Sequence, residues 1–416
     1  MGLLAKHSQT KEDKSNIITL GVLAKEAKKK NPNVVNATIG MLYDEEGKLF
    51  TFKSVDRALL DLTPEEKYAY SSTPGNAEYH EALKRWVFRE YYEEILSSMK
   101  CSVIATPGGS GAISNTFSNY LNPNDVVLLP EYMWGNYKQF AYENFAGYTT
   151  YSMFEENHFN LNSVKQKIEE IKNSQHRIVL VVNDPCHNPT GYTMSYEEWK
   201  ALIEIINTAT KDGTPFVLLY DMAYIDYDKR GFQATRKNIA LFQSLNPSVL
   251  AILAFSGSKS LALYGLRVGA QIALSKSTEV IEEFFSANKF SSRAKWSTTT
   301  NLGMNLITKV LTNPNYLNEF EKELKAASQQ LSRRASLFLE SAKKAGLKTL
   351  PFSCGFFITI PCDHPEEVYQ KLVEEKDIHI IPLDHILRVT IAAITEEECK
   401  RLPSEIKLAM NFCELK

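Results

Sequence analysis

The sequence predicts an α/β protein with a large domain built on a mostly parallel sheet and a smaller α+β domain. Three observations support this prediction. Apolar runs of strand length alternate with helical patterns through the middle of the 416-residue chain. Polar or glycine-rich stretches follow several of these runs, as they do where parallel strands end at a ligand site. After about residue 305 the pattern changes to a long helix, short strands and a final helix.

The strands of the large sheet are expected at five apolar runs. These are Asp125–Leu129, Arg177–Val182, Pro215–Tyr220, Val249–Phe255 and Val268–Leu274. Helical patterns lie between several of them, at Asn162–Lys172, Tyr196–Thr208 and Ile239–Leu245. Continuous runs of Val, Ile and Leu separated by helices are typical of a parallel sheet that is covered on both faces.

The small domain is predicted to be discontinuous. Residues 1–15 form an N-terminal arm, residues 16–48 and 320–416 form the small domain, and residues 49–319 form the large domain. The later segment contains a helical pattern that begins before the boundary, then short strands and a last helix. These are Tyr316–Ala345, Gly355–Ile360, His379–Pro382, Arg388–Ile391 and a helix from Thr395.

The composition is that of an ordinary globular enzyme. The formal net charge is −2, which argues against nucleic acid or an anionic membrane as a partner, because both need a basic patch. No apolar run approaches the length of a membrane span, and the polar N-terminal residues do not resemble a secretory signal. The six cysteines form no CxxC pair, and we expect them to be reduced thiols. We therefore expect a cytoplasmic protein.

Two motifs follow predicted strands. "TPGGSGAIS" (106–114) opens a helix, where free N–H groups favour a phosphate, although a purely structural turn is an alternative. "VVNDPCHNPTG" (181–191) runs from a strand into an Asn-Pro turn that fixes the amide of Asn188. The Asn188–Pro189 bond can be cis or trans. A Cys186–His187 catalytic pair is disfavoured, because neighbours on an extended chain point to opposite faces.

Two further motifs supply charged groups. Asp221 ends the apolar strand of "FVLLYDMAYIDY" (216–227), where a carboxylate needs a partner. A helix cap or a structural salt bridge is the alternative interpretation. "AFSGSKSLALYGLRVGA" (254–270) places Ser256, Ser258, Lys259 and Arg267 near one strand end. The guanidinium fork suits a phosphate, and Lys259 is either a second phosphate ligand or a Schiff-base lysine.

Together these residues match the needs of pyridoxal phosphate. Its aldehyde requires an amine, its phosphate requires hydroxyls, N–H groups and an arginine, and its ring nitrogen requires a carboxylate. The chain also resembles the class-I aminotransferases that depend on this cofactor, in the aspartate and aromatic aminotransferase branch. The motifs are "TPGGSGA", "CHNPTG", "YDMAY", "SGSK" with Arg267 eight residues on, and "RAKWS". The resemblance covers nearly the whole chain and implies the transferase fold type I with a seven-stranded sheet.

The resemblance implies a role for each matching residue. Lys259 forms the Schiff base with the cofactor and transfers protons, Asp221 pairs with the ring nitrogen, and Asn188 and Tyr224 bind the phenolic oxygen. Trp134 stacks on the ring. The phosphate is held by Gly109, Ser110, Ser256 and Arg267, with Tyr70 reaching across a homodimer that shares its active sites.

The substrate residues come from the same resemblance. Ile39, Gly40, Trp134 and Asn188 border the substrate, Arg388 binds its α-carboxylate, and Arg293 in "SSRAKWS" reaches from the neighbouring subunit to a distal carboxylate. A surface arginine is the alternative reading of Arg293. The implied activity is a ping-pong transamination in amino acid metabolism, between aspartate or an aromatic L-amino acid and 2-oxoglutarate.

The sequence departs from the family at two positions. Tyr137 and Asn183 stand where this branch carries histidines behind the aspartate that pairs with the ring nitrogen. The departures leave the choice between aspartate and aromatic substrates open.

The rival activities use the same scaffold. A β-lyase or a decarboxylase remains an alternative, whereas a non-catalytic regulator would need a DNA-binding segment that the 15-residue arm cannot supply. No metal site is expected, because "CDH" (362–364), His379 and His385 lack ligand spacing.

Overall fold

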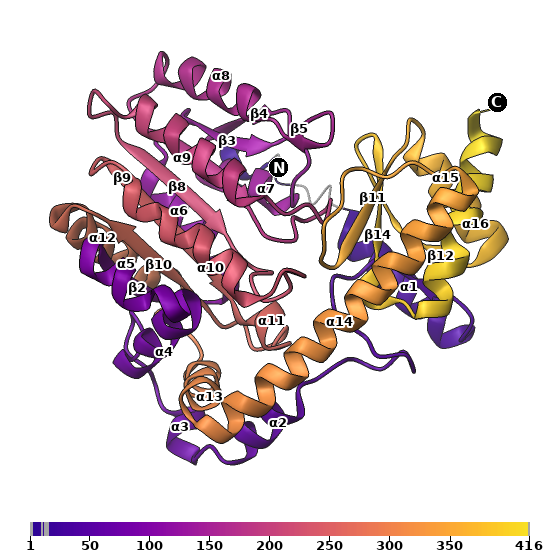
Figure 1. The fold of residues 1–416 in the computed structure, drawn as a ribbon, viewed down its shortest axis with the longest axis horizontal. Helices are drawn as coiled ribbons and strands as arrows, with labels where there is room; N and C mark the ends of the chain where they lie inside the picture. Colours follow the sequence, from indigo (N-terminus) through magenta and orange to yellow (C-terminus); the bar gives the residue numbers. More distant parts are fainter. Residues whose placement is uncertain (1–2, 10, 12–15, 415–416) are drawn as a thin grey trace.

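A seven-stranded sheet forms the centre of the larger part of the molecule (Figure 1). The computed structural model describes residues 3–9, 11 and 16–414. The spatial order of the strands is β2 (Lys100–Thr106), β10 (Gly269–Ser275), β9 (Val249–Ser256), β8 (Phe216–Asp221), β7 (Ile178–Asn183), β3 (Val126–Pro130) and β4 (Gly147–Tyr151). β10 runs opposite to the other six strands. The predicted fold class, with seven mostly parallel strands, is confirmed.

Helices cover both faces of this sheet, so its central strands are buried along their whole length. Alternate side chains point to opposite faces. Val179, Val217 and Ile252 pack against α6 (Gly108–Tyr120), α7 (Asn136–Glu143) and α12 (Thr278–Lys295). The other face packs against α4 (Ala77–Phe88), α8 (Leu161–Lys172), α9 (Tyr196–Ala209) and α10 (Phe232–Ala240). This double burial explains the continuous apolar runs.

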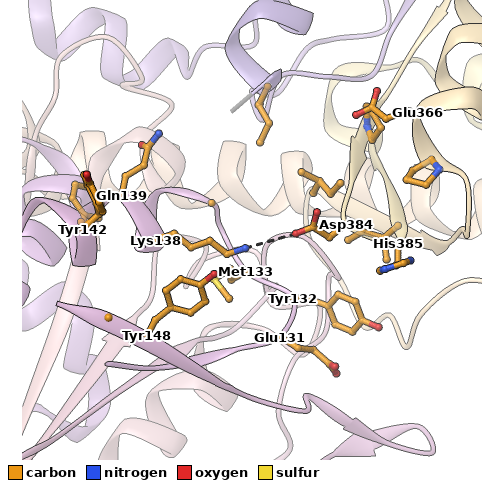
Figure 2. Close-up of a pocket in the computed structure, with 18 of the residues that line it drawn as sticks. Glu131, Tyr132, Met133, Lys138, Gln139, Tyr142, Tyr148, Glu366, Asp384 and His385 are labelled. Atoms are coloured by element: carbon orange, nitrogen blue, oxygen red, sulfur yellow. Dashed lines mark ion pairs between the residues drawn. The ribbon is translucent and has the colours of Figure 1, made fainter. Parts of the chain in front are cut away.

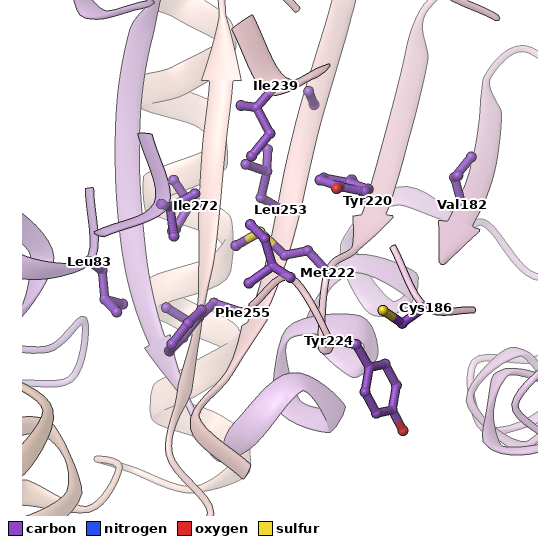
Figure 3. Packing of buried hydrophobic residues seen from close by; sticks show 14 of the residues in the cluster. Leu83, Val182, Cys186, Tyr220, Met222, Tyr224, Ile239, Leu253, Phe255 and Ile272 are labelled. Atoms are coloured by element: carbon purple, nitrogen blue, oxygen red, sulfur yellow. The ribbon is translucent and has the colours of Figure 1, made fainter. Parts of the chain in front are cut away.

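The apolar core of the second face continues into the loops beyond the strands. Figure 3 shows Tyr220, Met222 and Tyr224 following one another from β8 into the loop at its C-terminal end. Cys186, from the loop after β7, belongs to the same cluster. Because the loops pack on a buried core, the side chains they carry are held in fixed positions.

A second core lies at the other end of the molecule (Figure 1). It contains a three-stranded sheet of β11 (Phe357–Pro361), β14 (Ile386–Thr390) and β13 (Ile381–Leu383), and a parallel pair of β1 (Val35–Asn36) and β12 (Ile378–His379). The helices that pack here are α1 (Asn16–Lys30), α15 (Pro365–Lys376) and α16 (Glu396–Glu414).

One long helix, α14 (Pro314–Ala345), joins the two cores. Phe320 and Leu331 belong to the first core, whereas Phe338 and Ala342 belong to the second. The helix is continuous through residues 319 and 320, so the division of the chain at that point stays a prediction. The predicted arm at 1–15 includes residues 1–2, 10 and 12–15, which lie outside the described residues.

The remaining elements connect these parts. They are α2 (Lys53–Leu60), α3 (Pro64–Tyr68), α5 (Tyr92–Ser98), α11 (Gly257–Ser260), α13 (Asn301–Thr312) and a short hairpin of β5 (Phe154–Glu155) and β6 (His158–Phe159). Short 3₁₀ turns lie at Lys6–Ser8, Arg89–Tyr91, Leu241–Ser244 and Ile391–Ala393.

Two predicted elements differ in extent or pairing in the structure, and the edge strand β4 was not predicted. The predicted strand at His379–Pro382 is two strands in different sheets, because β12 pairs with β1 and β13 pairs with β14. The predicted helix at Ile239–Leu245 is the end of α10, which begins at Phe232, followed by a 3₁₀ turn. The start of α10 was not predicted because several of its buried residues are polar. Arg236 in α10 is fully buried and pairs with Asp226 at 2.6 Å.

Candidate active site

The amine of Lys259 lies at the centre of the predicted site, on the short helix α11 that follows β9. Its Nζ donates a hydrogen bond to the carbonyl oxygen of Gly40. Aromatic rings surround it. The Nζ lies 4.8 Å from the ring centre of Tyr264 and 5.7 Å from those of Tyr224 and Phe356. The position is apolar on several sides, as a nucleophilic lysine requires.

Burial changes the protonation of this amine. Burial, together with the nearby positive charges of Arg388 and Arg267, lowers the pKa of Lys259 to about 7. A buried amine with like charges around it prefers the neutral form. Near neutral pH a large share of the Lys259 side chains is therefore unprotonated and able to attack a carbonyl carbon.

Asp221 ends β8 as a buried carboxylate that is only 5% exposed. Its Oδ2 accepts a hydrogen bond from the Tyr137 hydroxyl at 2.5 Å, and its Oδ1 accepts one from the Ala223 N–H at 3.2 Å. The amide of Asn183 donates to the main-chain oxygen of Asp221 at 2.9 Å. Burial raises the pKa of Asp221, and the hydrogen bonds from Tyr137 and Ala223 oppose that rise.

The start of α6 has a geometry that suits an anion. Gly108 has a φ of +70°, and a Cβ added there would lie 2.9 Å from Nη2 of Arg267. The guanidinium therefore sits against the positive end of a helix, which is unfavourable unless an anion lies between them. Arg267 donates to Ser258 Oγ at 3.2 Å and to the Tyr264 carbonyl at 3.0 Å.

Three other predicted phosphate residues, Gly109, Ser110 and Ser256, are close to this helix start. Gly109 lies in the first turn of α6, and a Cβ added there would be 3.4 Å from the Cβ of Ser256. Ser110 is half-buried in the same turn. Glycine at 108 and 109 leaves no side chain at the helix start.

Arg388 enters the site from β14 of the second core and is 5% exposed. It donates to the Thr38 carbonyl at 2.7 Å and, weakly, to Asn188 Oδ1 at 3.5 Å. Its Cζ lies 4.7 Å from the ring centre of Phe357. Burial lowers the pKa of Arg388 to about 10.

The guanidinium of Arg388 can donate further hydrogen bonds to a ligand. Within the described part of the chain it has no carboxylate partner, and its buried Nε has no hydrogen-bond acceptor. An unpaired buried cation is costly. The arrangement fits a ligand that brings its own carboxylate.

Asn188 and Tyr224 lie beside Arg388. The Asn188 N–H donates to Asn183 Oδ1 at 2.8 Å, and the Asn188–Pro189 and Asp184–Pro185 bonds are cis. The ring of Tyr224 packs against Phe356 and Phe357 at 5.2 and 5.9 Å. Burial raises the pKa of the Tyr224 hydroxyl, which stays protonated as a hydrogen-bond donor.

Trp134 and the 39–40 segment complete the cluster. Trp134 is half-buried and meets the edge of Tyr137 with 5.7 Å between ring centres. A Cβ added to Gly40 would lie 2.9 Å from Cζ of Phe357, so only glycine fits there without movement. Ile39 is half-buried next to it.

Two predicted residues lie apart from this cluster. Arg293, in the last turn of α12, is exposed, and its Nη1 donates to Ser297 Oγ at 2.6 Å. Tyr70 is 95% exposed. Both were predicted to act across a subunit boundary, and the single chain does not test that role.

The disfavoured Cys186–His187 pair does not form. Cys186 Sγ lies 3.4 Å from Cys354 Sγ, whereas Nδ1 of His187 bonds to Thr190 Oγ1 at 2.9 Å.

Three aromatic residues of the site, Phe356, Phe357 and Tyr264, were not predicted. Phe357 contacts both Arg388 and Tyr224, and the hydroxyl of Tyr264 accepts a hydrogen bond from the Leu42 N–H at 2.9 Å. Phe357 lies within an apolar run, where nothing distinguishes it from a core residue. Tyr264 lies five positions after Lys259, and that proximity is the only signal that the sequence offers.

A groove of about 1400 Å³ adjoins the cluster between the two cores (Figure 2). Tyr132, Lys138 and Tyr148 line one wall, and Asp384 and His385 line the other. Lys138 Nζ lies 3.7 Å from Asp384 Oδ2 across it. None of the predicted site residues lines the groove, although its lining residues Met133 and Gly135 flank Trp134.

Comparison with known proteins identifies relatives of this chain. The model of the family "Aminotransferase class I and II" matches residues 32–406. Aspartate aminotransferase of Salmonella typhi is 28% identical over 322 residues, covering 76% of this chain and 78% of that protein. Aromatic-amino-acid aminotransferase of Escherichia coli strain K12 is 27% identical over 286 residues, covering 67% of this chain and 68% of that protein.

Solved structures share the fold along the whole chain. An aminotransferase from Anaerococcus prevotii superposes with a TM-score of 0.94 at 30% identity, over 99% of this chain and 100% of that one. Aspartate aminotransferase from the cytoplasm of Saccharomyces cerevisiae superposes with a TM-score of 0.82 at 17% identity, over 99% of this chain and 98% of that one.

Proposed function

The chain belongs to the class I and II aminotransferases, and we propose that it exchanges an amino group between aspartate or an aromatic L-amino acid and 2-oxoglutarate by a ping-pong mechanism. The observation that carries this proposal is the placement of Lys259. Its amine, whose pKa is about 7, lies between two features. One is the buried Arg388, which has no carboxylate partner among the described residues, and the other is the start of α6, which suits an anion.

The residues present fit pyridoxal phosphate, on which this family depends. An aromatic-amino-acid aminotransferase structure from Burkholderia pseudomallei is covalently bound to it. When bound, the cofactor supplies an aldehyde that takes up the amino group and a ring that accepts electrons. Its phosphate would be held at the start of α6 by Gly109, Ser110, Ser256 and Arg267, with the partner subunit's Tyr70.

The other contacts to the cofactor follow from the same cluster. Asp221 would hold the ring nitrogen as a cation, since a buried carboxylate needs such a partner. Asn188 and the protonated hydroxyl of Tyr224 would donate to the phenolic oxygen. Trp134, which is half-buried, would cover one face of the ring.

The chain's own residues then bind the substrate and move its proton. Arg388 binds the α-carboxylate with a planar fork that fixes the orientation of the amino acid. The free amine of Lys259, neutral above a pH of about 7, accepts the proton from the substrate Cα at its Nζ. Gly40, Ile39 and Phe357 exclude water from one side of this position.

Arg293 would determine the preference for dicarboxylic substrates. Its guanidinium is exposed, where a neighbouring subunit can approach it, and the relatives include enzymes named for aspartate and for aromatic amino acids. An arginine that pairs with a distal carboxylate favours aspartate and 2-oxoglutarate. The same site would accept an aromatic ring if this arginine turns aside.

The proposed assembly is a homodimer in the cytoplasm. No helix in the described ranges is long and apolar enough to cross a lipid bilayer. A relative from Dictyostelium discoideum is named as cytoplasmic.

Product analysis tests the reaction. The purified protein, supplied with pyridoxal phosphate, L-aspartate and 2-oxoglutarate, is expected to form oxaloacetate and glutamate in equal amounts. Ammonia or carbon dioxide as the main product would instead indicate a lyase or a decarboxylase on the same scaffold.

A further inference from the structure

Tyr137 supports the carboxylate of Asp221 from behind. It is the second residue of α7, it is fully buried, and its hydroxyl donates to Asp221 Oδ2 at 2.5 Å. The edge of its ring also meets Trp134, with 5.7 Å between ring centres at 83°. One side chain therefore contacts both a charged group and an aromatic ring of the proposed site.

The phenol is a donor under all working conditions. Burial and the negative charge of Asp221 raise the pKa of the Tyr137 hydroxyl well above its usual value, so it does not ionise. The same hydrogen bond lowers the pKa of Asp221 and opposes the effect of burial on it. Tyr137 thus stabilises the ionised form of the carboxylate.

The donor is neutral, and so are the other groups at this carboxylate. Ala223 contributes an N–H to Oδ1, and the amide of Asn183 contacts the main-chain oxygen. Among the described residues no cation is paired with Asp221. A hydrogen bond from a neutral group leaves the negative charge in place, whereas an ion pair would compensate it. The full charge of Asp221 therefore remains available to a ligand.

We propose that Tyr137 is a positioning residue that keeps Asp221 ionised and oriented toward the ring nitrogen of the cofactor without sharing its charge. This inference rests on the proposed function, since it requires that Asp221 meets that nitrogen. Tyr137 acts through Asp221 and does not itself touch the reacting atoms.

The test compares two ligands that differ in one atom. Cofactor-free protein is titrated calorimetrically with pyridoxal phosphate and with its deaza analogue, in which a C–H group replaces the ring nitrogen. The Tyr137→Phe variant removes only the hydroxyl and keeps the ring against Trp134. The Tyr151→Phe control removes another fully buried phenol, whose hydroxyl donates to the Val181 carbonyl at 3.4 Å.

Y137F is expected to weaken binding of pyridoxal phosphate by about ten- to a hundredfold, because Asp221 loses the donor that keeps it ionised and oriented toward the ring nitrogen. Binding of the deaza analogue is expected to change by less than about twofold, since it offers no nitrogen to Asp221. Y151F should leave the ratio of the two affinities unchanged.

The outcomes distinguish a failure of this inference from a failure of the proposed function. If Y137F binds both ligands more weakly by the same factor, the role of Tyr137 is purely structural. If it binds pyridoxal phosphate as tightly as the wild type, the hydroxyl is dispensable. Either result overturns this inference and leaves the proposed function standing. A wild-type protein that fails to bind pyridoxal phosphate would overturn the proposed function itself and this inference with it.

Discussion

The amine of Lys259 donates a hydrogen bond to the main-chain carbonyl of Gly40, although the two residues are 219 positions apart in the sequence. The contact brings the segment after β1 over the lysine that follows β9. The rings of Tyr264, Tyr224 and Phe356 close the remaining sides.

Removal of the lysine is expected to change how stability depends on pH. The pKa of Lys259 falls from 10.5 to about 7 on folding. Below pH 7 both the folded and the unfolded chain carry this proton, so folding buries a cation. Between pH 7 and 10.5 the unfolded chain binds more protons, and the free energy of unfolding rises with pH.

Chemical denaturation of cofactor-free protein measures this effect. Relative to Lys259→Met, the wild type should gain stability from pH 6 to pH 9, because the other titrating groups are common to both. A difference in unfolding free energy that stays constant across this range would show that the folded-state pKa of Lys259 is not depressed.

Arg388 is expected to bind every amino acid substrate through its α-carboxylate. Arg388→Lys replaces the fork with a point charge, so KM should rise about ten- to a hundredfold for aspartate and phenylalanine alike. Arg334→Lys is a matched control, since Arg334 is fully buried but already paired with Glu45 at 2.7 Å. It should lower the melting temperature and leave KM unchanged. An unchanged KM in R388K would remove Arg388 from the site.

Arg293 is expected to discriminate between substrates. Arg293→Leu should raise KM for aspartate by about a hundredfold and leave KM for phenylalanine nearly unchanged, because only aspartate offers a distal carboxylate. Lys289→Leu removes another exposed cation of α12 and should affect neither substrate. Full activity of R293L on aspartate would contradict the proposed substrate class.

Shared active sites predict complementation between two variants that are each nearly inactive at low aspartate concentration. In a mixed dimer of K259A and R293L chains, one site combines the intact Lys259 of one chain with the intact Arg293 of the other. Random exchange of equal amounts should therefore restore about a quarter of the wild-type activity on aspartate. If mixing restores nothing, both residues act within one chain or the chains do not exchange; size-exclusion chromatography of differently tagged chains distinguishes these cases.

The sequence predicted the strands whose two faces are both buried. The runs that became β7, β8 and β9 are continuous and apolar because both faces of these strands are covered. The edge strand β4 was missed, since Gly147 and Tyr148 are exposed and its "GYTTY" sequence lacks an apolar run. The segment after Ile378 was predicted as one strand, because its two pairing partners lie in distant parts of the chain.

The residues of the candidate active site were predictable where they lie at or just after the end of a strand. Asp221 and Lys259 both do: Asp221 is the last residue of β8, and Lys259 lies in the short helix α11 that follows β9. Contacts between distant segments were not predictable. Neither the Lys259–Gly40 contact nor the packing of Arg388 on Phe357 has a local signal. Tyr137 was noted only as a departure from the family, and its bond to Asp221 emerged from the fold.

The absorbance spectrum of the purified protein with pyridoxal phosphate, before and after L-aspartate, tests the central claim most directly. L-phenylalanine in a parallel cuvette and the Lys259→Ala variant complete the experiment. The account predicts that the wild type shows the band of cofactor bound through a lysine, that aspartate converts it to the aminated cofactor, and that K259A lacks the initial band. Conversion by phenylalanine alone would contradict the role of Arg293. A wild type without a cofactor band would contradict the assignment of Lys259 and, with it, the proposed activity.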